Sequence, residues 1–288
     1  MNCLVSVVLG SYNRRKFLPK CLDNVRRELA NIPHEIIVVD GGSVDGSLKW
    51  LIKQKDILTI AQHNHGSWRG QKLPRRSWGY FMNLGFKAAR GKYICMLSDD
   101  CLLVPGAIKN ALADFEARLA VGAKIGALAF YWRDWPVENF YAVYAFVGDI
   151  LNVNHGLYLN SALREVGFLD ETTYRFYAGD IDVCLKLTDV GYQIVAAENS
   201  YVEHYAHANF RARFKNNKQH QEADRLALIK KWSFRYGLES ANYARKTLKK
   251  DFQDTTHTVR KFYWRYFWNG WEYPLYLYKL WRKFRAES

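Results

Sequence analysis

Acidic and hydroxyl side chains gather directly after short apolar runs of this sequence. Ser98, Asp99 and Asp100 follow one such run, and Asp40 follows another. Carboxylate and hydroxyl oxygens are the ligands that hard cations such as Mg²⁺ and Mn²⁺ favour, and substrate phosphates often complete their coordination. A solvated turn that caps a helix would use the same residue types. The chemistry that these residues suggest is a cation held beside a phosphate-bearing substrate.

The hydrophobic pattern predicts the strands and helices that position these residues. Four β-branched-rich apolar runs alternate with amphipathic helical stretches, at 4–9, 35–39, 57–61 and 92–97. This alternation predicts an α/β fold with a mostly parallel sheet flanked by helices. Ligands of such sheets bind at the carboxyl ends of the strands, where Ser11, Tyr12 and Asn13 also lie.

Later segments continue the pattern. The stretch 62–78 has no periodicity and is expected to be a long loop. We expect helices at 79–90, 106–120 and 180–190 and strands at 125–131 and 193–203.

Composition excludes several classes of protein. The chain has 288 residues, of which 49% are hydrophobic and 24% charged, so it is neither a disordered tail nor a collagen-like repeat. Its five cysteines lack C-x-x-C spacing, which argues against a disulfide framework and a structural zinc site and favours a cytoplasmic location. We expect neither a signal peptide nor a membrane-spanning helix.

The net charge of +14 is concentrated after residue 210. Residues 211–288 hold 19 Lys and Arg against 7 Asp and Glu, and the stretch 260–285 interleaves them with Trp, Tyr and Phe. This composition suits an anionic surface, so we expect a peripheral membrane contact through 260–285. Packing on the catalytic domain or in a homodimer is the alternative. A nucleic-acid-binding protein is a further alternative, but residues 1–210 are nearly neutral and show no nucleic-acid motif.

Four motifs carry a resemblance to a known family. They are Ser11-Tyr12-Asn13-Arg14, then Asp40 with Ser43, Asp45 and Gly46, then Asn83, Gly85, Ala89, Gly91 and Tyr93, and finally Ser98-Asp99-Asp100. In this order and spacing the chain resembles the inverting family 2 glycosyltransferases over roughly residues 4–232. The resemblance implies a Rossmann-like GT-A fold. We therefore expect a catalytic domain at 1–210, with a nucleotide-sugar half at 1–104 and an acceptor half at 105–210, and a helical extension at 211–288.

The resemblance also implies roles at the donor site. Ser11 and Asp40 would lie around the nucleotide base and ribose, with Tyr12 and Asn13 helping to shape that pocket. Asp100 would be the main ligand of Mn²⁺ or Mg²⁺, and Asp99 would contact either the ribose or a ligand of the metal. Ser98 stands where the family's Asp-x-Asp motif has its first Asp.

A transferase of this type needs a base for the acceptor hydroxyl. The family keeps one in a Glu-Asp pair at a helix N-terminus, and the matching stretch here is 178–187, with Asp180 as the expected base and Gly179 in place of the Glu. The stretch 167–171, GFLDE, supports this alignment. Asp180 and Asp182 would otherwise only complement a helix dipole.

Further residues are expected around the reacting sugar. His204 resembles a late His that some members bring to the metal, and Arg75 and Arg76 are candidate phosphate contacts or plain solvated arginines. Trp132, His155 and Asp182 are candidate acceptor contacts, and His155 would lie near the donor sugar.

The resulting expectation is an inverting transferase that uses a UDP- or dTDP-sugar. Its acceptor would be a glycan or a lipid-linked sugar in surface polysaccharide or glycolipid synthesis, at the inner face of the membrane. A nucleotidyltransferase of similar fold is the alternative within enzymes, but the stretch 10–15, GSYNRR, lacks the glycine repetition of that class.

Overall fold

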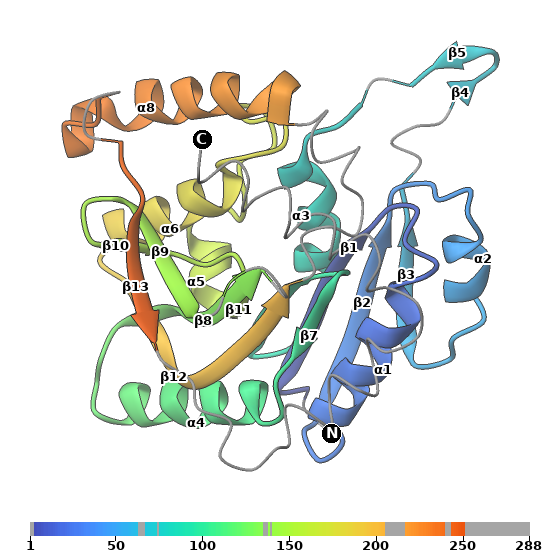
Figure 1. The fold of residues 1–288 in the computed structure, drawn as a ribbon, viewed down its shortest axis with the longest axis horizontal. Coiled ribbons are helices and arrows are strands. Elements are labelled where there is room, and N and C mark those ends of the chain that lie inside the picture. The colour runs from blue at the N-terminus through green and yellow to red at the C-terminus, as the bar shows by residue number, and fades with distance from the viewer. Residues whose placement is uncertain are drawn as a thin grey trace, which may run out of the picture.

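One large sheet forms the centre of the molecule, and the helices pack against it (Figure 1). The structure is a computed structural model that describes residues 3–62, 67–73, 75–134, 138, 140–204, 217–239 and 243–250. Eleven strands of the described chain form one sheet, with the order β10-β9-β8-β11-β6-β1-β2-β3, while β12 pairs with β7 and β8, and β13 pairs with β9. The strands are β1 (Val5–Ser11), β2 (His34–Asp40), β3 (Ile57–Ala61), β6 (Tyr93–Ser98), β7 (Cys101–Leu103), β8 (Ile125–Asp134), β9 (Tyr141–Val147), β10 (Ile150–Asn152), β11 (Gly156–Leu159), β12 (Gln193–His204) and β13 (Lys246–Lys250).

The N-terminal half of this sheet is parallel. Strand β1 runs parallel to both β2 and β6, and β2 runs parallel to β3. The four apolar runs expected as strands are therefore confirmed. The carboxyl ends of these strands meet at one edge, because β1 pairs Ser11 with Asp40 on β2 and Gly10 with Ser98 on β6.

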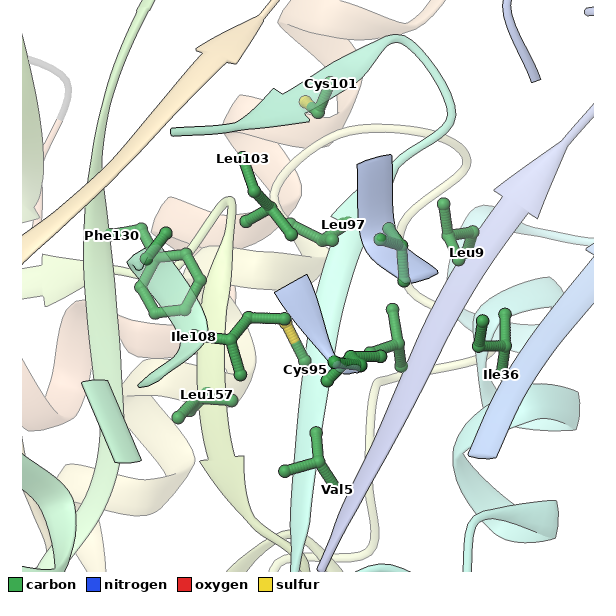
Figure 2. Close-up of a cluster of buried hydrophobic side chains, with 14 of the residues drawn as sticks. Val5, Leu9, Ile36, Cys95, Leu97, Cys101, Leu103, Ile108, Phe130 and Leu157 are labelled. Atoms are coloured by element: carbon green, nitrogen blue, oxygen red, sulfur yellow. The ribbon is translucent and has the colours of Figure 1, made fainter. Parts of the chain in front are cut away.

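Helices cover both faces of the sheet. They are α1 (Leu18–Glu28), α2 (Ser47–Leu51), α3 (Trp78–Ala88), α4 (Ala107–Ala120), α5 (Asn160–Glu165), α6 (Gly179–Asp189) and α8 (Glu222–Tyr236), with a π-helical turn η1 (Asn217–Gln221) before α8. Alternate residues of β1 face opposite sides. Val5 and Leu9 pack in a cluster with α1 and α4, and Val8 packs in another with α3, α5 and α6. Figure 2 shows the first cluster, with Cys101 at one end.

The second half of the sheet is mixed, so parallel pairing covers less of the sheet than expected. Strand β11 runs antiparallel to β6 and β8, while β12 is parallel to β8 and antiparallel to β7. Strand β12 thereby brings its last residue, His204, back to the edge where β6 ends. In the expected loop 62–78, a short hairpin forms from β4 (Ser67–Trp68) and β5 (Gln71–Lys72).

The segment expected as a separate extension also contributes to the main body. Leu228 and Trp232 of α8 are buried against α6, and β13 adds to the sheet beside β9. Figure 1 shows α8 lying across α6 at one end of the molecule. The stretch 260–285 lies outside the described residues, and none of the described helices is long and apolar enough to cross a membrane.

Candidate active site

The loop after β1 is fastened to the loop after β2. The Asn13 backbone N–H donates to Ser43 Oγ at 2.8 Å, and the Val44 N–H donates to Asn13 Oδ1 at 2.9 Å. Asn13 has a φ of 55°, a left-handed conformation that Asn tolerates better than most residues. Its side chain thus positions the loop, while the adjacent Tyr12 is 38% exposed at the same edge.

Asp40 and Ser11 present buried oxygens that the described residues do not satisfy. Asp40 Oδ1 accepts from the N–H groups of Gly42 and Ser43, at 2.9 and 2.7 Å. Asp40 Oδ2 is buried and has no hydrogen-bond partner in the described chain, and the buried Ser11 Oγ makes no full hydrogen bond there, although the Ser11 hydroxyl lies near enough to Asp99 to lower the pKa of that carboxyl. A buried polar atom without a partner costs about 1–3 kcal/mol. Neighbouring oxygens of this kind suit the hydroxyl groups of a bound ribose.

Asp99 and Asp100 form a buried acidic pair that Arg14 bridges. Arg14 Nε lies 3.3 Å from Asp99 Oδ1, and Arg14 Nη2 lies 3.5 Å from Asp100 Oδ2. Burial raises the pKa of Asp99, and the charge of Asp100 adds to that effect. The pKa of Asp100 is lowered despite its burial, because His204 and Arg14 favour the carboxylate. Arg14 belongs to the first motif, but no role was predicted for it. Its contacts with both acids become visible only in the fold.

His204 lies beside this pair and is held by Asp134. His204 Nδ1 donates to Asp134 Oδ1 at 2.8 Å, which leaves Nε2 at 3.4 Å from Asp100 Oδ1. Although burial opposes it, the two carboxylates raise the pKa of His204 to about 10. Asp134 was not among the predicted site residues, because its place depends on the register of β8 and β12, which pairs it with His204.

His155 and Trp132 complete the surroundings of His204. The ring centroids of His155 and His204 are 5.4 Å apart, and Trp132 packs edge-on against both. Burial and the charge of His204 lower the pKa of His155 to about 3, so His155 is neutral. Trp132 is half-buried against these imidazoles, and its contact with an acceptor stays a prediction.

The acidic pair and His204 fit a divalent cation. Asp99 Oδ2 is buried without a hydrogen-bond partner among the described residues, and the contact of the buried Asp100 Oδ1 is the ion pair with His204 Nε2 at 3.4 Å. A cation would neutralise the charge of both carboxylates, and His204 Nε2 offers a further ligand atom once the cation displaces its proton. Carboxylate oxygens with one imidazole are a donor set that Mn²⁺ and Mg²⁺ accept.

Asp180 is positioned at the N-terminus of α6. Asn152 and Asn154 donate to Asp180 Oδ2 at 3.1 and 2.7 Å, and the Ile181 N–H donates to Oδ1 at 3.0 Å. Burial raises the pKa of Asp180. The residue before the helix, Ala178, has a φ of 66°, a strained conformation that the surrounding packing must hold.

A contiguous set of contacts links Asp180 to the cation site. Asn154 bonds to Asp180, the next residue His155 lies against His204, and His204 lies against Asp100. Asn152 and Asn154 were not among the predicted site residues, because they become neighbours of α6 only through β10 and the loop that follows it.

Asp182, expected as an acceptor contact, is fully buried instead. Tyr174 Oη, Trp232 Nε1 and Lys231 Nζ all contact its Oδ1, at 2.9, 2.8 and 2.8 Å. These contacts fasten α8 to α6 and leave no exposed surface on Asp182. Asp182 therefore joins α6 and α8 and is not part of the proposed active site.

Arg75 and Arg76 lie on the exposed segment before α3. The Arg75 carbonyl accepts from Arg175 Nη1 at 2.8 Å, and the Arg76 guanidinium lies 5.2 Å from the ring centroid of Tyr80. Their contact with a diphosphate stays a prediction.

The GFLDE stretch has a structural role in this fold. Asn83 Nδ2 donates to the Leu169 carbonyl at 2.9 Å, and the Leu169 N–H donates back to Asn83 Oδ1 at 3.1 Å. Gly79 is required beside it, because a Cβ there would lie 2.1 Å from the Asp170 carbonyl oxygen. The motif that contains Asn83 and the GFLDE stretch thus fasten α3 to the segment that leads into α6.

Comparison with known proteins defines the class. The model of the family "Glycosyl transferase family 2" matches residues 6–171, and the chain belongs to that family. This membership favours a glycosyltransferase over the nucleotidyltransferase and nucleic-acid-binding alternatives.

Curated relatives are similarly named. The chain is 29% identical over 146 residues to the glycosyltransferase GlyG of Streptococcus pneumoniae, covering 49% of this chain and 44% of that protein. It is 24% identical over 197 residues to the chondroitin synthase of Escherichia coli, covering 65% of this chain and 27% of that protein. The chain therefore spans less than half the length of these two relatives. A dolichyl N-acetyl-glucosaminyl phosphate glucuronosyltransferase of Methanococcus voltae is 22% identical, and 81% of this chain and 78% of that protein are covered.

Solved structures show that the fold is of the GT-A type. The TarS 1–349 structure from S. aureus has a TM-score of 0.56 at 17% identity and covers 83% of this chain and 67% of that one. The mannosyltransferase PcManGT of Pyrobaculum calidifontis, solved with GDP-Man and Mn²⁺, has a TM-score of 0.56 at 16% identity, with 78% and 64% coverage. TarS has also been solved with UDP-GlcNAc.

Proposed function

We propose that this chain transfers a sugar from a nucleotide-diphosphate donor to an acceptor hydroxyl with inversion at the anomeric carbon. The observation that carries this proposal is a group of four buried oxygens near the carboxyl edge of the sheet that find no full hydrogen bond among the described residues: Ser11 Oγ, Asp40 Oδ2, Asp99 Oδ2 and Asp100 Oδ1, the last of which lies 3.4 Å from His204 Nε2. The first two lie in register at the carboxyl edge of the sheet, and Arg14 connects the adjacent loop to the other two. A nucleotide sugar with a cation would satisfy all four.

In this proposal, Ser11 and Asp40 bind the ribose and base, with Tyr12 beside them. Asp100 and His204 hold Mn²⁺ or Mg²⁺, and Asp99 contacts the ribose or the metal's surroundings. The cation, when bound, supplies Lewis-acid stabilisation of the departing diphosphate. Arg14 adds fixed positive charge at the acidic pair.

Asp180 is the proposed base. The acceptor oxygen forms a bond to the anomeric carbon as the bond from that carbon to the diphosphate oxygen breaks, and Asp180 takes the hydroxyl proton. Burial raises the pKa of Asp180 and so brings its basicity nearer to that of a working base at neutral pH. Asn152 and Asn154 hold the accepting oxygen in place.

The donor and acceptor are proposed from the relatives. UDP-GlcNAc and GDP-Man are bound by the solved neighbours, and we propose a UDP- or dTDP-sugar here. The names of the chondroitin synthase and of the dolichyl phosphate sugar transferase support a glycan or lipid-linked acceptor. We propose surface polysaccharide or glycolipid synthesis at the cytoplasmic face of a membrane.

A thermal-shift screen of nucleotide sugars with and without Mn²⁺ tests this proposal. One donor should stabilise the protein only with the cation, by about 2.7 kcal/mol at a hundredfold excess over its Kd. Asp100→Asn should abolish that stabilisation. Asp180→Asn should keep it but lower the transfer rate by about 10²–10⁴-fold. Full turnover by Asp180→Asn would remove this residue from the base role.

A further inference from the structure

Three soft or borderline metal ligands lie together at the edge of the candidate active site. The ligand atoms of Cys101, His155 and His204 lie within 4.8 Å of one another. They do not share a sequence motif. Cys101 is the cross-strand partner of His204 in the β7–β12 pair, and His155 precedes β11, where its carbonyl accepts from the Phe130 N–H at 2.9 Å. Three separate strands of the sheet therefore fix the cluster.

The distances already approach those of a tetrahedral site. Cys101 Sγ lies 3.6 Å from His155 Nε2, and His204 Nε2 lies 3.4 Å from Asp100 Oδ1. Zinc bonds of about 2.3 Å to sulfur and about 2.0–2.2 Å to nitrogen and oxygen give tetrahedral edges of about 3.6 Å for S to N and about 3.4 Å for N to O. Each of these two pairs alone therefore has the separation of a tetrahedral edge, and the ligand atoms of Cys101, His155 and His204 lie within 4.8 Å of one another.

The surroundings orient the ligands. His204 Nδ1 donates to Asp134, which directs Nε2 toward the cluster in the arrangement that commonly supports a metal-binding imidazole. Asp100 Oδ1 is buried, and its contact in the described part of the chain is the ion pair with His204 Nε2 at 3.4 Å. Cys101 and His155 are only 2% and 4% exposed, so their ligand atoms face the protein interior.

We propose that Cys101, His155 and His204 form a site for a borderline-soft divalent cation, of which Zn²⁺ is the type, and that Asp100, which lies 3.4 Å from His204 Nε2, moves in as the fourth ligand. Protein side chains then complete the coordination of the cation, so binding needs no nucleotide. This differs from the oxygen-rich Mn²⁺ or Mg²⁺ site of the proposed reaction, whose coordination a diphosphate must complete. The bound cation displaces two protons, the thiol proton of Cys101 and the Nε2 proton of His204, since a coordinating thiol is deprotonated and a coordinating imidazole is neutral.

One consequence rests on the proposed function. Asp100 and His204 belong to both sites, so a Zn²⁺ ion held by them excludes the cation that accompanies the donor. Zn²⁺ therefore inhibits transfer by competing with Mn²⁺, whereas Zn²⁺ binding itself does not depend on the chain being a transferase.

Titration of the full-length, metal-free, reduced protein with Co²⁺ tests the site, because Co²⁺ reports a thiolate ligand through a charge-transfer absorption band. Without nucleotide, the wild-type protein should show this band, and Zn²⁺ should displace the Co²⁺. Cys101→Ser should abolish the band and weaken Zn²⁺ binding by at least about tenfold, since losing even a partner of a ligand costs about 10–100-fold. His155→Ala should weaken binding while keeping the band.

Cys95→Ser is the matched control, because Cys95 is equally buried on β6 but lies outside the cluster. It should keep both the band and the Zn²⁺ affinity, with circular dichroism confirming that each variant is folded. Absence of the band from wild-type protein, or unchanged Zn²⁺ affinity in folded Cys101→Ser, would overturn the site. Mn²⁺-dependent donor binding is measured separately, so its failure would refute the proposed function without bearing on the Co²⁺ result.

Discussion

At the scale of single residues, Asp100 and Asp180 of the candidate active site have different surroundings, which shift their pKa values in opposite directions. Asp100 faces His204 and Arg14, and its pKa is lowered despite burial, so it stays ionised as a metal ligand should. Asp180 receives hydrogen bonds from asparagines rather than contacts from cations, and burial raises its pKa. The same side-chain type is thus suited to a ligand in one place and a base in another.

The raised pKa of Asp180 predicts the acid side of the pH profile. The base must be ionised to accept a proton, so kcat should fall as the pH drops through this pKa. The Asn152 side chain stabilises the ionised form, and Asn152→Ala should raise the pKa further and move the acid limb to higher pH. Steady-state kinetics across pH, at saturating donor and acceptor, measure the shift. A limb that stays in place or moves to lower pH would contradict this role for Asn152.

At the scale of elements, α8 holds the segment that leads to Asp180. Asp224 on α8 accepts from three successive backbone N–H groups, those of Arg175, Phe176 and Tyr177, at 2.7–2.8 Å. These residues directly precede Ala178, whose left-handed conformation begins α6. A helix beyond residue 210 therefore positions the proposed base.

Replacing Asp224 should therefore affect both stability and catalysis. Asp224→Ala removes the charged acceptor of three partly buried hydrogen bonds, and we expect the free energy of unfolding to fall by about 1–3 kcal/mol. The value of kcat should fall with little change in donor affinity, because the donor residues lie on other elements. Urea denaturation and steady-state kinetics check this. Glu222→Ala, on the exposed part of the same helix, is the control, and equal effects of the two substitutions would argue against positioning by Asp224.

Much of the fold could be predicted from the sequence. Apolar runs and helical periodicity locate β1, β2, β3 and β6 to within a residue or two, because buried parallel strands have a strong local pattern. The meeting of Ser11 and Asp40 follows from that pattern. Contacts that depend on register between distant strands could not be predicted, and the pairing of His204 with both Cys101 and Asp134 is the main example. Asp182 is another, because its surroundings depend on how α8 packs against α6.

At the scale of the whole molecule, positive charge is concentrated in the C-terminal quarter. We predict that the full chain binds vesicles containing anionic phospholipid and that binding weakens with salt, since each basic residue near the surface contributes about 1 kcal/mol. Replacing Arg260, Lys261 and Arg265 by Glu removes about 3 kcal/mol of this attraction and should weaken vesicle binding by about a hundredfold or more. Replacing Lys49, Lys53 and Lys55 by Glu is the control of equal charge change. Equal loss in both variants would indicate a general charge effect, and no loss in either would refute the membrane contact.

The central claim is that Asp100 binds a cation together with the nucleotide of the donor. Electron paramagnetic resonance of free Mn²⁺, measured during titration of the full chain with and without UDP, tests it most directly. We predict that UDP tightens Mn²⁺ binding by tenfold or more in the wild-type protein, as linkage requires when two ligands share a site, and that Asp100→Asn abolishes this coupling. Mn²⁺ affinity that is the same with and without UDP, or coupling that survives in Asp100→Asn, would contradict the account.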